Sequence, residues 1–142
     1  MSGSSGRNGE SGKEGSGLLV DSDIFIDVLR GYEPARDYLK KLLTDGRALF
    51  FSAVTETELL AGSECNNVQK REDALHMLSY FDKISVDNPL AQAAGDFRRK
   101  YPHLKTPDAI IAASAFLTHC ILATKNAKDF EKIDGLNVQK PY

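Results

Sequence analysis

The sequence predicts an α/β fold, a three-layer α/β/α domain around a central, mostly parallel sheet of four or five strands. Short apolar runs of strand length alternate along the chain with longer segments in which apolar residues recur at helical spacing. No hairpin signal lies between the apolar runs, and the chain contains no internal repeats. These observations together favour helices packed on both faces of one parallel sheet.

The first 17 residues differ from the rest of the chain in composition. They hold 6 of the 11 glycines and five serines, with no apolar residue after Met1. Such a segment cannot bury enough surface to offset the chain entropy lost on folding, so we expect residues 1–17 to be a flexible Gly/Ser-rich tag or linker. Residues 18–142 then form one domain of ordinary size.

This domain is expected to begin with a strand and two helices. The apolar run at residues 18–20 stops at Asp21, as a buried parallel strand does before its loop. Residues 24–30 form a short helix that a glycine closes, and residues 34–43 form a second helix that an Asp-Gly pair ends.

The next predicted elements are a strand at residues 48–51 and two further helices. Thr55 is the expected N-cap of a helix that runs to about residue 65, with Glu58 three residues later as in a capping box. Residues 68–81 carry an apolar stripe at helical spacing, which indicates another amphipathic helix.

Two helices and three strands complete the predicted domain. A helix over residues 89–101 ends in basic side chains, and Thr106-Pro107-Asp108 starts another that runs to about residue 117. Because this last helix is rich in alanine, we expect it to pack closely against a neighbour. The strands are expected at residues 84–86, 121–123 and, at the edge, 136–138.

Composition excludes several classes of protein. The chain has no run of 18 apolar residues for a membrane span and no basic-then-apolar signal segment. Cys65 and Cys120 cannot form a disulfide scaffold and lack zinc-site spacing, so a reduced, cytoplasmic protein is expected. The net charge of −2 argues against a protein that coats nucleic acid by bulk charge.

Acidic and amide side chains follow the predicted strands at their carboxyl ends. Asp21 follows the first strand, Glu58 lies early in the helix after the second, Asp108 starts the alanine-rich helix, and Asn126 follows the fourth strand. Ligands of open parallel sheets bind beyond this edge. Clustered oxygen ligands without Cys or His select Mg²⁺ or Mn²⁺, which can activate water and neutralise a phosphate.

Each of these acids also fits an ordinary structural role. Asp21 is a possible N-cap for the next helix, with Asp23 as the acid of its first turn. Glu58 with Thr55 makes a capping box, and the helix dipole alone favours Asp108. The case for a site therefore depends on their common position at the carboxyl ends of parallel strands.

Other acids compete for the same site. Glu56 lies two residues from Glu58, and because residues two apart on a helix face differently, only one of them can enter. Spacing alone leaves three further candidates: Asp23, Asp27 and Asp129, the last of which would lie beside Asn126 if that segment is helical.

Four segments resemble those of PIN-domain ribonucleases, and most closely the VapC toxins of bacterial and archaeal toxin–antitoxin pairs. The likeness covers essentially the whole chain from Leu18 to Tyr142. Four motifs in the right order are far more specific than any one of them. The segments are residues 20–27 (VDSDIFID), 54–62 (VTETELLAG), 107–113 (PDAIIAA) and 123–126 (ATKN).

The resemblance implies RNA cleavage that depends on Mg²⁺ or Mn²⁺. Matched by position, the metal-binding acids of the family fall on Asp21, Glu58 and Asp108, which selects Glu58 over Glu56. The fourth site position falls on Asn126, where the family often carries Asp. An amide supplies only a neutral oxygen, so Asp129 or Asp23 is a candidate to assist.

Further polar residues are assigned auxiliary roles. Thr124 or Ser22 is expected to hydrogen-bond a phosphate oxygen or a metal-bound water. A basic segment that leads to Asp108 is the local candidate for holding the RNA backbone, although cations at a helix end are also favoured by the helix dipole. Its residues are Arg98, Arg99, Lys100 and Lys105, with His103 among them.

Partners follow from the same resemblance. VapC toxins are usually homodimers, and a VapB antitoxin inhibits them by covering the acidic site with its C-terminal segment. Apolar faces on the helices over residues 34–43 and 68–81 are candidates for such contacts, although core packing competes for the same side chains. The antitoxin, rather than this acidic chain, is expected to bind operator DNA.

Two alternative functions stay open. Asp21-Ser22-Asp23 matches the D-x-D of haloacid-dehalogenase-type phosphatases, but Lys125-Asn126 with Asp129 supplies the required later lysine and paired acids poorly. The other alternative is a catalytically weak PIN fold that binds RNA or a partner, since the fourth acid is missing.

Overall fold

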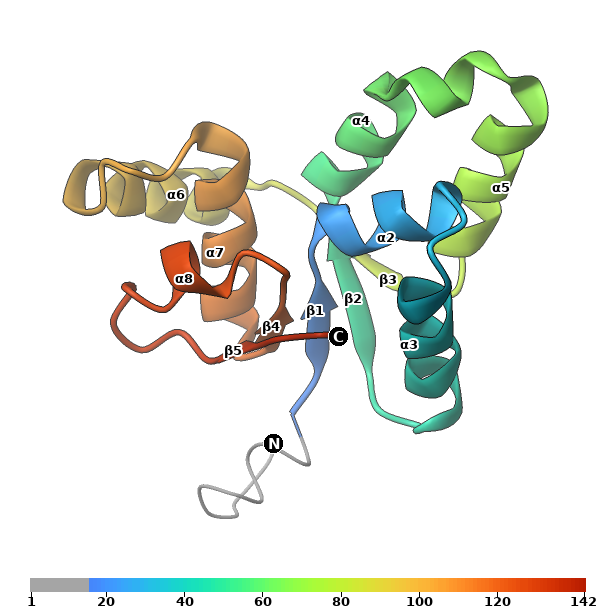
Figure 1. Ribbon diagram of the computed structural model, residues 1–142. Coiled ribbons are helices and arrows are strands. Elements are labelled where there is room, and N and C mark those ends of the chain that lie inside the picture. The colour runs from blue at the N-terminus through green and yellow to red at the C-terminus, as the bar shows by residue number, and fades with distance from the viewer. Residues whose placement is uncertain (1–15) are drawn as a thin grey trace.

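The computed structural model describes residues 16–142, and it places a five-stranded sheet between two layers of helices (Figure 1). The strand order is β3-β2-β1-β4-β5, and all four neighbouring pairs are parallel. The predicted α/β class and parallel sheet are confirmed. The strands are β1 (Leu18–Val20), β2 (Leu49–Ser52), β3 (Asp82–Ile84), β4 (Ile121–Ala123) and β5 (Val138–Gln139).

The first strand, β1, lies at the centre of the sheet, and the side on which later strands are added changes once. After β1 it builds outward through β2 to β3, and then crosses back to place β4 on the other side of β1. Leu18 therefore pairs with Leu49 on one side and with Ile121 on the other. In open parallel sheets, ligands bind beyond the strand ends where the order reverses, which here lies between β1 and β4.

Apolar side chains fill both faces of the sheet. Leu18 and Val20 belong to one core cluster and Leu19 to the other, because successive strand residues point to opposite faces. In the first cluster the ring of Phe25 packs edge-to-face against Phe81, with ring centroids 5.1 Å apart. A sheet that is buried on both faces makes the predicted three layers.

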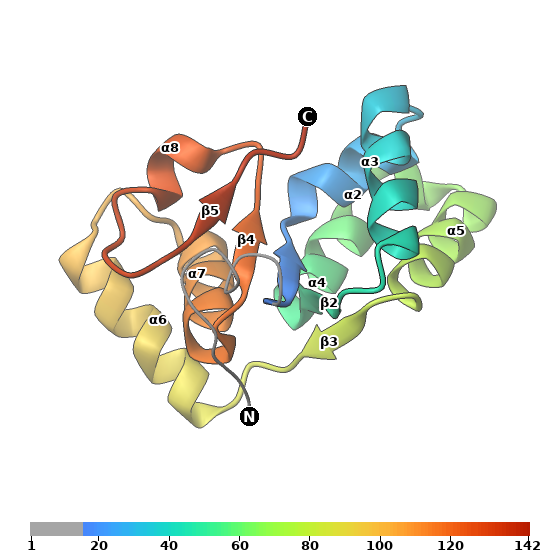
Figure 2. The same ribbon diagram turned by 90° about the horizontal axis from the view of Figure 1, so that it is seen from below.

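The helices divide between the two faces, as Figures 1 and 2 show from two directions. Because all neighbouring strands are parallel, every connection between consecutive strands crosses over a face of the sheet. One layer holds α2 (Ser22–Leu29), α3 (Glu33–Thr44), α4 (Ala53–Ala61), the short 3₁₀ turn η2 (Ser63–Asn66) and α5 (Val68–Leu78). The other holds α6 (Asn88–Lys100), α7 (Thr106–Thr118) and α8 (Ala127–Phe130).

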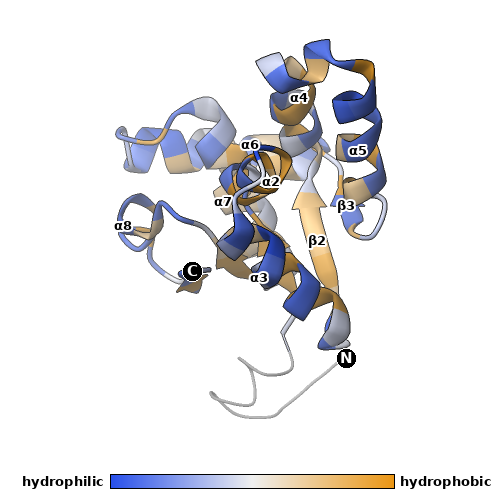
Figure 3. Cartoon of the chain, turned by 45° about the vertical axis from the view of Figure 1, so that its right-hand side comes forward, coloured by the Kyte–Doolittle hydropathy of each residue, from blue (hydrophilic) through white to orange (hydrophobic). Residues whose placement is uncertain are grey.

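The alanine-rich helix α7 lies against α6 and the sheet. Ala109, Ala112, Ala113 and Ala115 are all buried, and their small side chains allow the close approach that the sequence predicted. Figure 3 shows the complementary pattern, with β2 apolar along its length and the outer side of α3 largely hydrophilic. Neither free cysteine forms a disulfide within residues 16–142.

Two predicted helix starts are wrong. Helix α4 begins at Ala53, because the Ser52 hydroxyl accepts a hydrogen bond from the Val54 amide at 3.2 Å and caps the helix three residues before Thr55. Thr55 is instead fully buried inside the first turn. Thr106 is the first residue of α7 rather than its cap, and Lys105 occupies the cap position without a side-chain hydrogen bond.

Several predicted boundaries also shift. Strand β3 starts at Asp82, which pairs with Phe50, two residues before the predicted start. Asp82 and Lys83 are exposed at the sheet edge, so an apolar run does not mark this strand. Strand β5 is likewise displaced to Val138–Gln139, and the third predicted helix ends at Ala61 rather than near residue 65.

Most of the predicted tag or linker, residues 1–17, lies outside the described residues. Its last two members belong to the fold: the Gly17 carbonyl accepts a hydrogen bond from the Ile121 amide at 2.9 Å, and the Ser16 carbonyl accepts one from Arg47 at 3.0 Å. A Cβ atom at Gly17 would lie 2.8 Å from the Phe50 ring, so glycine suits this close approach. Ser16 and Gly17, the last two residues of the predicted tag or linker, thus contact the domain.

Candidate active site

Asp21 lies at the point where the strand order reverses. Its amide extends the sheet by donating to the Ala123 carbonyl at 2.9 Å, and its side chain caps α2 by accepting from the Ser22 amide at 2.7 Å. The second carboxylate oxygen accepts from the Thr124 hydroxyl, also at 2.7 Å. The predicted N-cap role is therefore confirmed, and the same carboxylate joins the ends of β1 and β4.

Burial makes the charge of Asp21 unfavourable. The side chain is 6% exposed, and the pKa of this carboxyl is raised from 3.8 to about 7, first by desolvation and then by the negative charge of Asp23. The Thr124 and Ser22 hydrogen bonds oppose the rise in pKa, and Asp108 adds to it. A buried carboxylate with acidic neighbours is stabilised by a cation.

Glu58 is connected to Asp21 through the next residue in the chain. The Ser22 hydroxyl donates to Glu58 at 2.5 Å and lies 2.7 Å from the Thr55 hydroxyl. The early start of α4 places Thr55 and Glu58 on the side of that helix that faces α2. Glu58 thus enters the site from the second turn of α4, not as half of a capping box.

Glu56 points away from this group. Its carboxylate forms an ion pair with Lys83 of β3 at 3.1 Å. The two glutamates therefore face different neighbours, and Glu58 is the one that contacts Ser22.

Asp108 approaches from the opposite helix layer. It lies in the first turn of α7 and is partly buried. Burial raises the pKa of its carboxyl, and the negative charges of Glu58 and Asp129 raise it further, while Lys105 and His103 lower it. Asp108 therefore interacts electrostatically with acids from two other elements.

The fourth predicted position belongs to a small network after β4. The Asn126 amide donates to the Thr124 hydroxyl at 3.0 Å, and its side-chain nitrogen donates to the Asp129 carboxylate at 2.9 Å. Residues 127–130 form α8, as the pairing of Asn126 with Asp129 required. Asp129 is thus held beside the amide of Asn126.

Asp23 lies one residue inside α2. Its Oδ1 atom is buried and has no hydrogen-bond partner among the described residues. Burial raises the pKa of this carboxyl, the positive charge of Lys125 lowers it, and Asp27 raises it. An unpartnered buried carboxylate oxygen at this edge of the sheet fits a site that takes a cation or a bound donor.

The predicted basic segment divides into two groups. Arg98 braces the loop before α7 by donating to the Leu104 carbonyl at 3.1 Å and to the Thr106 hydroxyl at 3.2 Å. Arg99 pairs with Asp96, and Lys100 lies over its neighbouring tyrosine ring. The other group is Lys105 and His103, whose electrostatic effect lowers the pKa of Asp108.

The donor set fits a hard divalent cation. The side chains gathered at this edge offer carboxylate, amide and hydroxyl oxygens, the ligands that Mg²⁺ and Mn²⁺ prefer. Within residues 16–142, no three His, Cys, Asp or Glu side chains lie together closely enough to hold an ion as they stand. Glu58 accepts the hydrogen bond from the Ser22 hydroxyl through one of its two carboxylate oxygens, Oε1.

Sequence reasoning missed a cluster beside the carboxylates. The Lys125 ammonium donates to Asp27 at 2.7 Å, and the Tyr142 hydroxyl donates to the same carboxylate oxygen at 2.7 Å. Burial tends to raise the pKa of Asp27, but these two hydrogen bonds and Lys125 outweigh it and hold the pKa low. Lys125 could have been noticed from its place between Thr124 and Asn126, whereas no local signal marks Tyr142.

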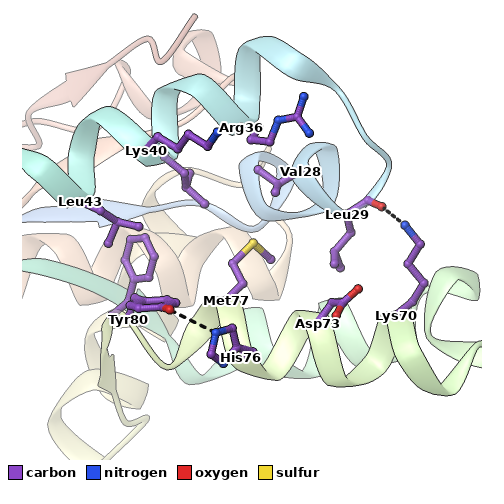
Figure 4. Close-up of a pocket in the computed structure, with 12 residues that line it drawn as sticks. Val28, Leu29, Arg36, Lys40, Leu43, Lys70, Asp73, His76, Met77 and Tyr80 are labelled. Atoms are coloured by element: carbon purple, nitrogen blue, oxygen red, sulfur yellow. Dashed lines mark hydrogen bonds between the residues drawn. The ribbon is translucent and has the colours of Figure 1, made fainter.

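An apolar groove of about 380 Å³ lies elsewhere, between α3 and α5 (Figure 4). Leu43 and Tyr80 contribute side chains that are 43% and 58% exposed. Lys70 spans one end by donating to the Leu29 carbonyl at 3.0 Å. None of the predicted site residues lines this groove.

None of the helices in the described part of the chain is long and apolar enough to cross a membrane.

Known sequences provide the family context. The family model described as "PIN domain" matches residues 18–136. Ribonuclease VapC10 of Mycobacterium tuberculosis is 33% identical over 123 residues, which cover 84% of this chain and 90% of the relative. The tRNA(fMet)-specific endonuclease VapC of Shigella flexneri is 27% identical, over 86% of this chain and 96% of its own.

Solved structures agree with this result. A toxin–antitoxin complex from Klebsiella pneumoniae contains a chain that matches with a TM-score of 0.73 and 32% identity, covering 88% of this chain and 98% of that one. VapBC2 from Rickettsia felis, bound to a promoter DNA fragment, gives a TM-score of 0.74 over 87% and 98% of the two chains. Its identity of 19% supports the fold alone.

Proposed function

The chain belongs to the PIN domain family and is similar to the VapC ribonucleases, and on this premise we propose that it is a metal-dependent toxin ribonuclease that hydrolyses RNA phosphodiester bonds. One observation carries the proposal beyond the family name. Asp21, Glu58 and Asp108 come from three separate elements, yet the negative charge of Asp108 raises the pKa of Asp21 and that of Glu58 raises the pKa of Asp108, which supports a shared site. The domain is taken as residues 18–142.

In this proposal Asp21, Glu58 and Asp108 hold Mg²⁺ or Mn²⁺. When bound, such an ion supplies an activated water nucleophile and neutralises charge on the phosphate. The chain itself orients the ligands. Thr124 and the Ser22 amide hold the two oxygens of Asp21, and the Ser22 hydroxyl holds Glu58. Fixed carboxylates reduce the reorganisation needed to reach the reactive arrangement.

The remaining polar residues complete the charge balance. Asn126 orients Asp129, which adds negative charge beside Asp108. Lys105 and His103 bring positive charge to the same side, where they would meet the phosphate oxygens of an incoming strand. The segment leading to Asp108 thus contributes through these two residues more directly than through its arginines.

We also propose an antitoxin partner and a homodimer, both from the family resemblance. The exposed apolar side chains of the α3–α5 groove support an apolar helix of the antitoxin as its occupant. Solved relatives that are toxin–antitoxin complexes support a partner of this kind. A cytoplasmic location remains part of the proposal.

The test is RNA cleavage by purified protein free of antitoxin. We expect single-stranded RNA to be cut with Mg²⁺ or Mn²⁺ and left intact with EDTA, and we expect Asp108→Asn to lose at least about 100-fold in rate. Glu56→Gln is the matched control, because Glu56 lies on the same helix as Glu58 but pairs with Lys83.

Other outcomes select the alternatives. RNA that is bound but left intact across several metals would indicate a binding module. Turnover of p-nitrophenyl phosphate with a covalent aspartyl-phosphate at Asp21 would indicate a phosphatase. The phosphatase alternative requires a later lysine at the site. Lys125 is instead paired with Asp27 at 2.7 Å, so this contact does not support a phosphatase.

A further inference from the structure

A second pocket, of about 640 Å³, opens beside the carboxylates. Three segments contribute residues to its lining. Gly31 and Tyr32 follow α2, Lys140 and Tyr142 follow β5, and Lys125 lies in the turn after β4. This volume lies within the range of pockets that hold small molecules or single nucleotides.

The pocket adjoins the proposed catalytic edge. Lys125 lies between Thr124, which holds Asp21, and Asn126, which holds Asp129. The same lysine contacts Asp27, one turn along α2 from Asp23, and its charge lowers the pKa of Asp23. A strand whose phosphate lies at the carboxylates therefore has the pocket within reach of its neighbouring nucleotide.

The pocket carries positive charge, unlike the carboxylate site. Arg30, Lys125 and Lys140 line it against one acid, Asp27. Arg30 also pairs with Glu64 at 2.9 Å, and Lys140 makes no ion pair within the described part of the chain. Cations placed next to an acidic site suit the phosphate that flanks a scissile bond, rather than the scissile phosphate itself.

Two tyrosine rings give the pocket an aromatic wall. Tyr32 is 50% exposed and Tyr142 is 39% exposed, and their ring centroids are 5.7 Å apart. Tyr142 is held by its hydroxyl contact with Asp27 and by the ring of Tyr38 at 5.9 Å. The Tyr32 amide donates to the Asp27 carbonyl at 3.0 Å, so both tyrosines are positioned by the same residue.

We propose that this pocket binds one nucleotide of a single-stranded RNA substrate, with its base against Tyr32 and its phosphate held by Lys140 and Lys125. The inference rests on the proposed ribonuclease function and adds a subsite to it. Exposed rings on a fixed backbone favour base stacking, which is how unpaired RNA is commonly bound. Cations beside the rings supply the backbone contact.

The test is RNA binding, measured by fluorescence anisotropy of a labelled single-stranded decamer with EDTA present so that nothing is cleaved. We expect Tyr32→Ala to weaken binding about tenfold and Tyr32→Phe to retain it, since stacking needs the ring and not the hydroxyl. Lys140→Ala should weaken binding and reduce the dependence on salt by about one phosphate contact. Circular dichroism confirms that each variant is folded.

Matched controls lie outside the pocket. Phe116→Ala removes an exposed aromatic ring of α7 that does not line the pocket, and Lys41→Ala removes an exposed lysine of α3. Both should bind RNA as the parent chain does. Unchanged affinity in Tyr32→Ala and Lys140→Ala overturns the subsite, and so does an equal loss in the controls.

Two further results separate the subsite from the proposed function. A parent chain that binds RNA through Tyr32 but cleaves none with any metal leaves the subsite standing and overturns the ribonuclease. A chain that cleaves RNA but whose pocket variants lose affinity only for an acidic peptide, oligoglutamate, overturns the subsite and leaves the ribonuclease standing.

Discussion

Removing the charge of Asp21 while keeping its shape should stabilise the metal-free protein at alkaline pH. Burial raises the pKa of this carboxyl from 3.8 to about 7. Between those values the folded state holds a proton that the unfolded state has released, so stability falls as pH rises through this window. The contribution is complete below pH 4 and lost above pH 7. Asp21→Asn abolishes this dependence.

The size of the effect follows from the shift. About three pKa units at roughly 1.4 kcal/mol each give an upper bound of about 4 kcal/mol. An asparagine still accepts from the Ser22 amide but cannot accept from the Thr124 hydroxyl, which costs about 1 kcal/mol. At pH 8 we therefore expect Asp21→Asn to raise the free energy of unfolding by about 1–3 kcal/mol.

The assay is urea unfolding with EDTA, followed by circular dichroism at pH 5 and at pH 8. Asp23 and Asp108 also have raised pKa values and keep some pH dependence in both proteins, so the difference between the two curves isolates Asp21. If the free energy of unfolding changes equally between pH 5 and pH 8 in the parent chain and in Asp21→Asn, burial of the charged Asp21 carboxylate does not destabilise the fold.

Three other substitutions test separate parts of the structure. Thr124→Val removes the hydroxyl that donates to Asp21, and we expect a loss of about 1–3 kcal/mol in urea unfolding at pH 8, with a smaller loss at pH 5 where the carboxyl is protonated. Glu58→Gln should reduce RNA cleavage at least about 100-fold, while Glu56→Gln should leave the rate within about twofold in the same fluorogenic assay. Phe25→Ala should lower the free energy of unfolding by about 3–5 kcal/mol, because it removes a fully buried ring that packs against Phe81.

The layer order and the parallel sheet could be predicted because a strand that is buried on both faces is apolar at every position. A run such as Leu18–Val20 is apolar throughout only if both faces of its strand are covered, and the core clusters confirm this. Strand β3 carries no such apolar pattern. Its exposed Asp82 and Lys83 pair with β2 through backbone hydrogen bonds, and the pattern of apolar residues cannot predict such pairing.

Helix starts were less predictable because several residues compete to cap the same turn. Both Ser52 and Thr55 suit an N-cap, and only the length of β2 decides between them. The position of this cap also affects the candidate site. Capping at Ser52 moves Thr55 inward and allows the Ser22 hydroxyl to link Thr55 to Glu58.

Sequence predicts the positions of candidate site residues where the fold determines them. Asp21 and Asp108 follow from strand ends and helix starts, and the structure places them within electrostatic range of each other. The Asp27–Lys125–Tyr142 cluster was not predictable, since it joins α2, the turn after β4 and the chain beyond β5. Contacts between residues so far apart in sequence depend on the folded arrangement of the strands.

The central claim is that the carboxylates at the carboxyl edge of the sheet bind a divalent cation. Isothermal titration of Mn²⁺ at pH 6.5, in two buffers of different ionisation enthalpy, tests it most directly. We predict binding that releases protons, because the raised pKa of Asp21 leaves it largely protonated before the ion binds, and loss of that proton release in Asp21→Asn. Mn²⁺ binding without proton release, or equal binding by Asp21→Asn and the parent chain, would contradict the account.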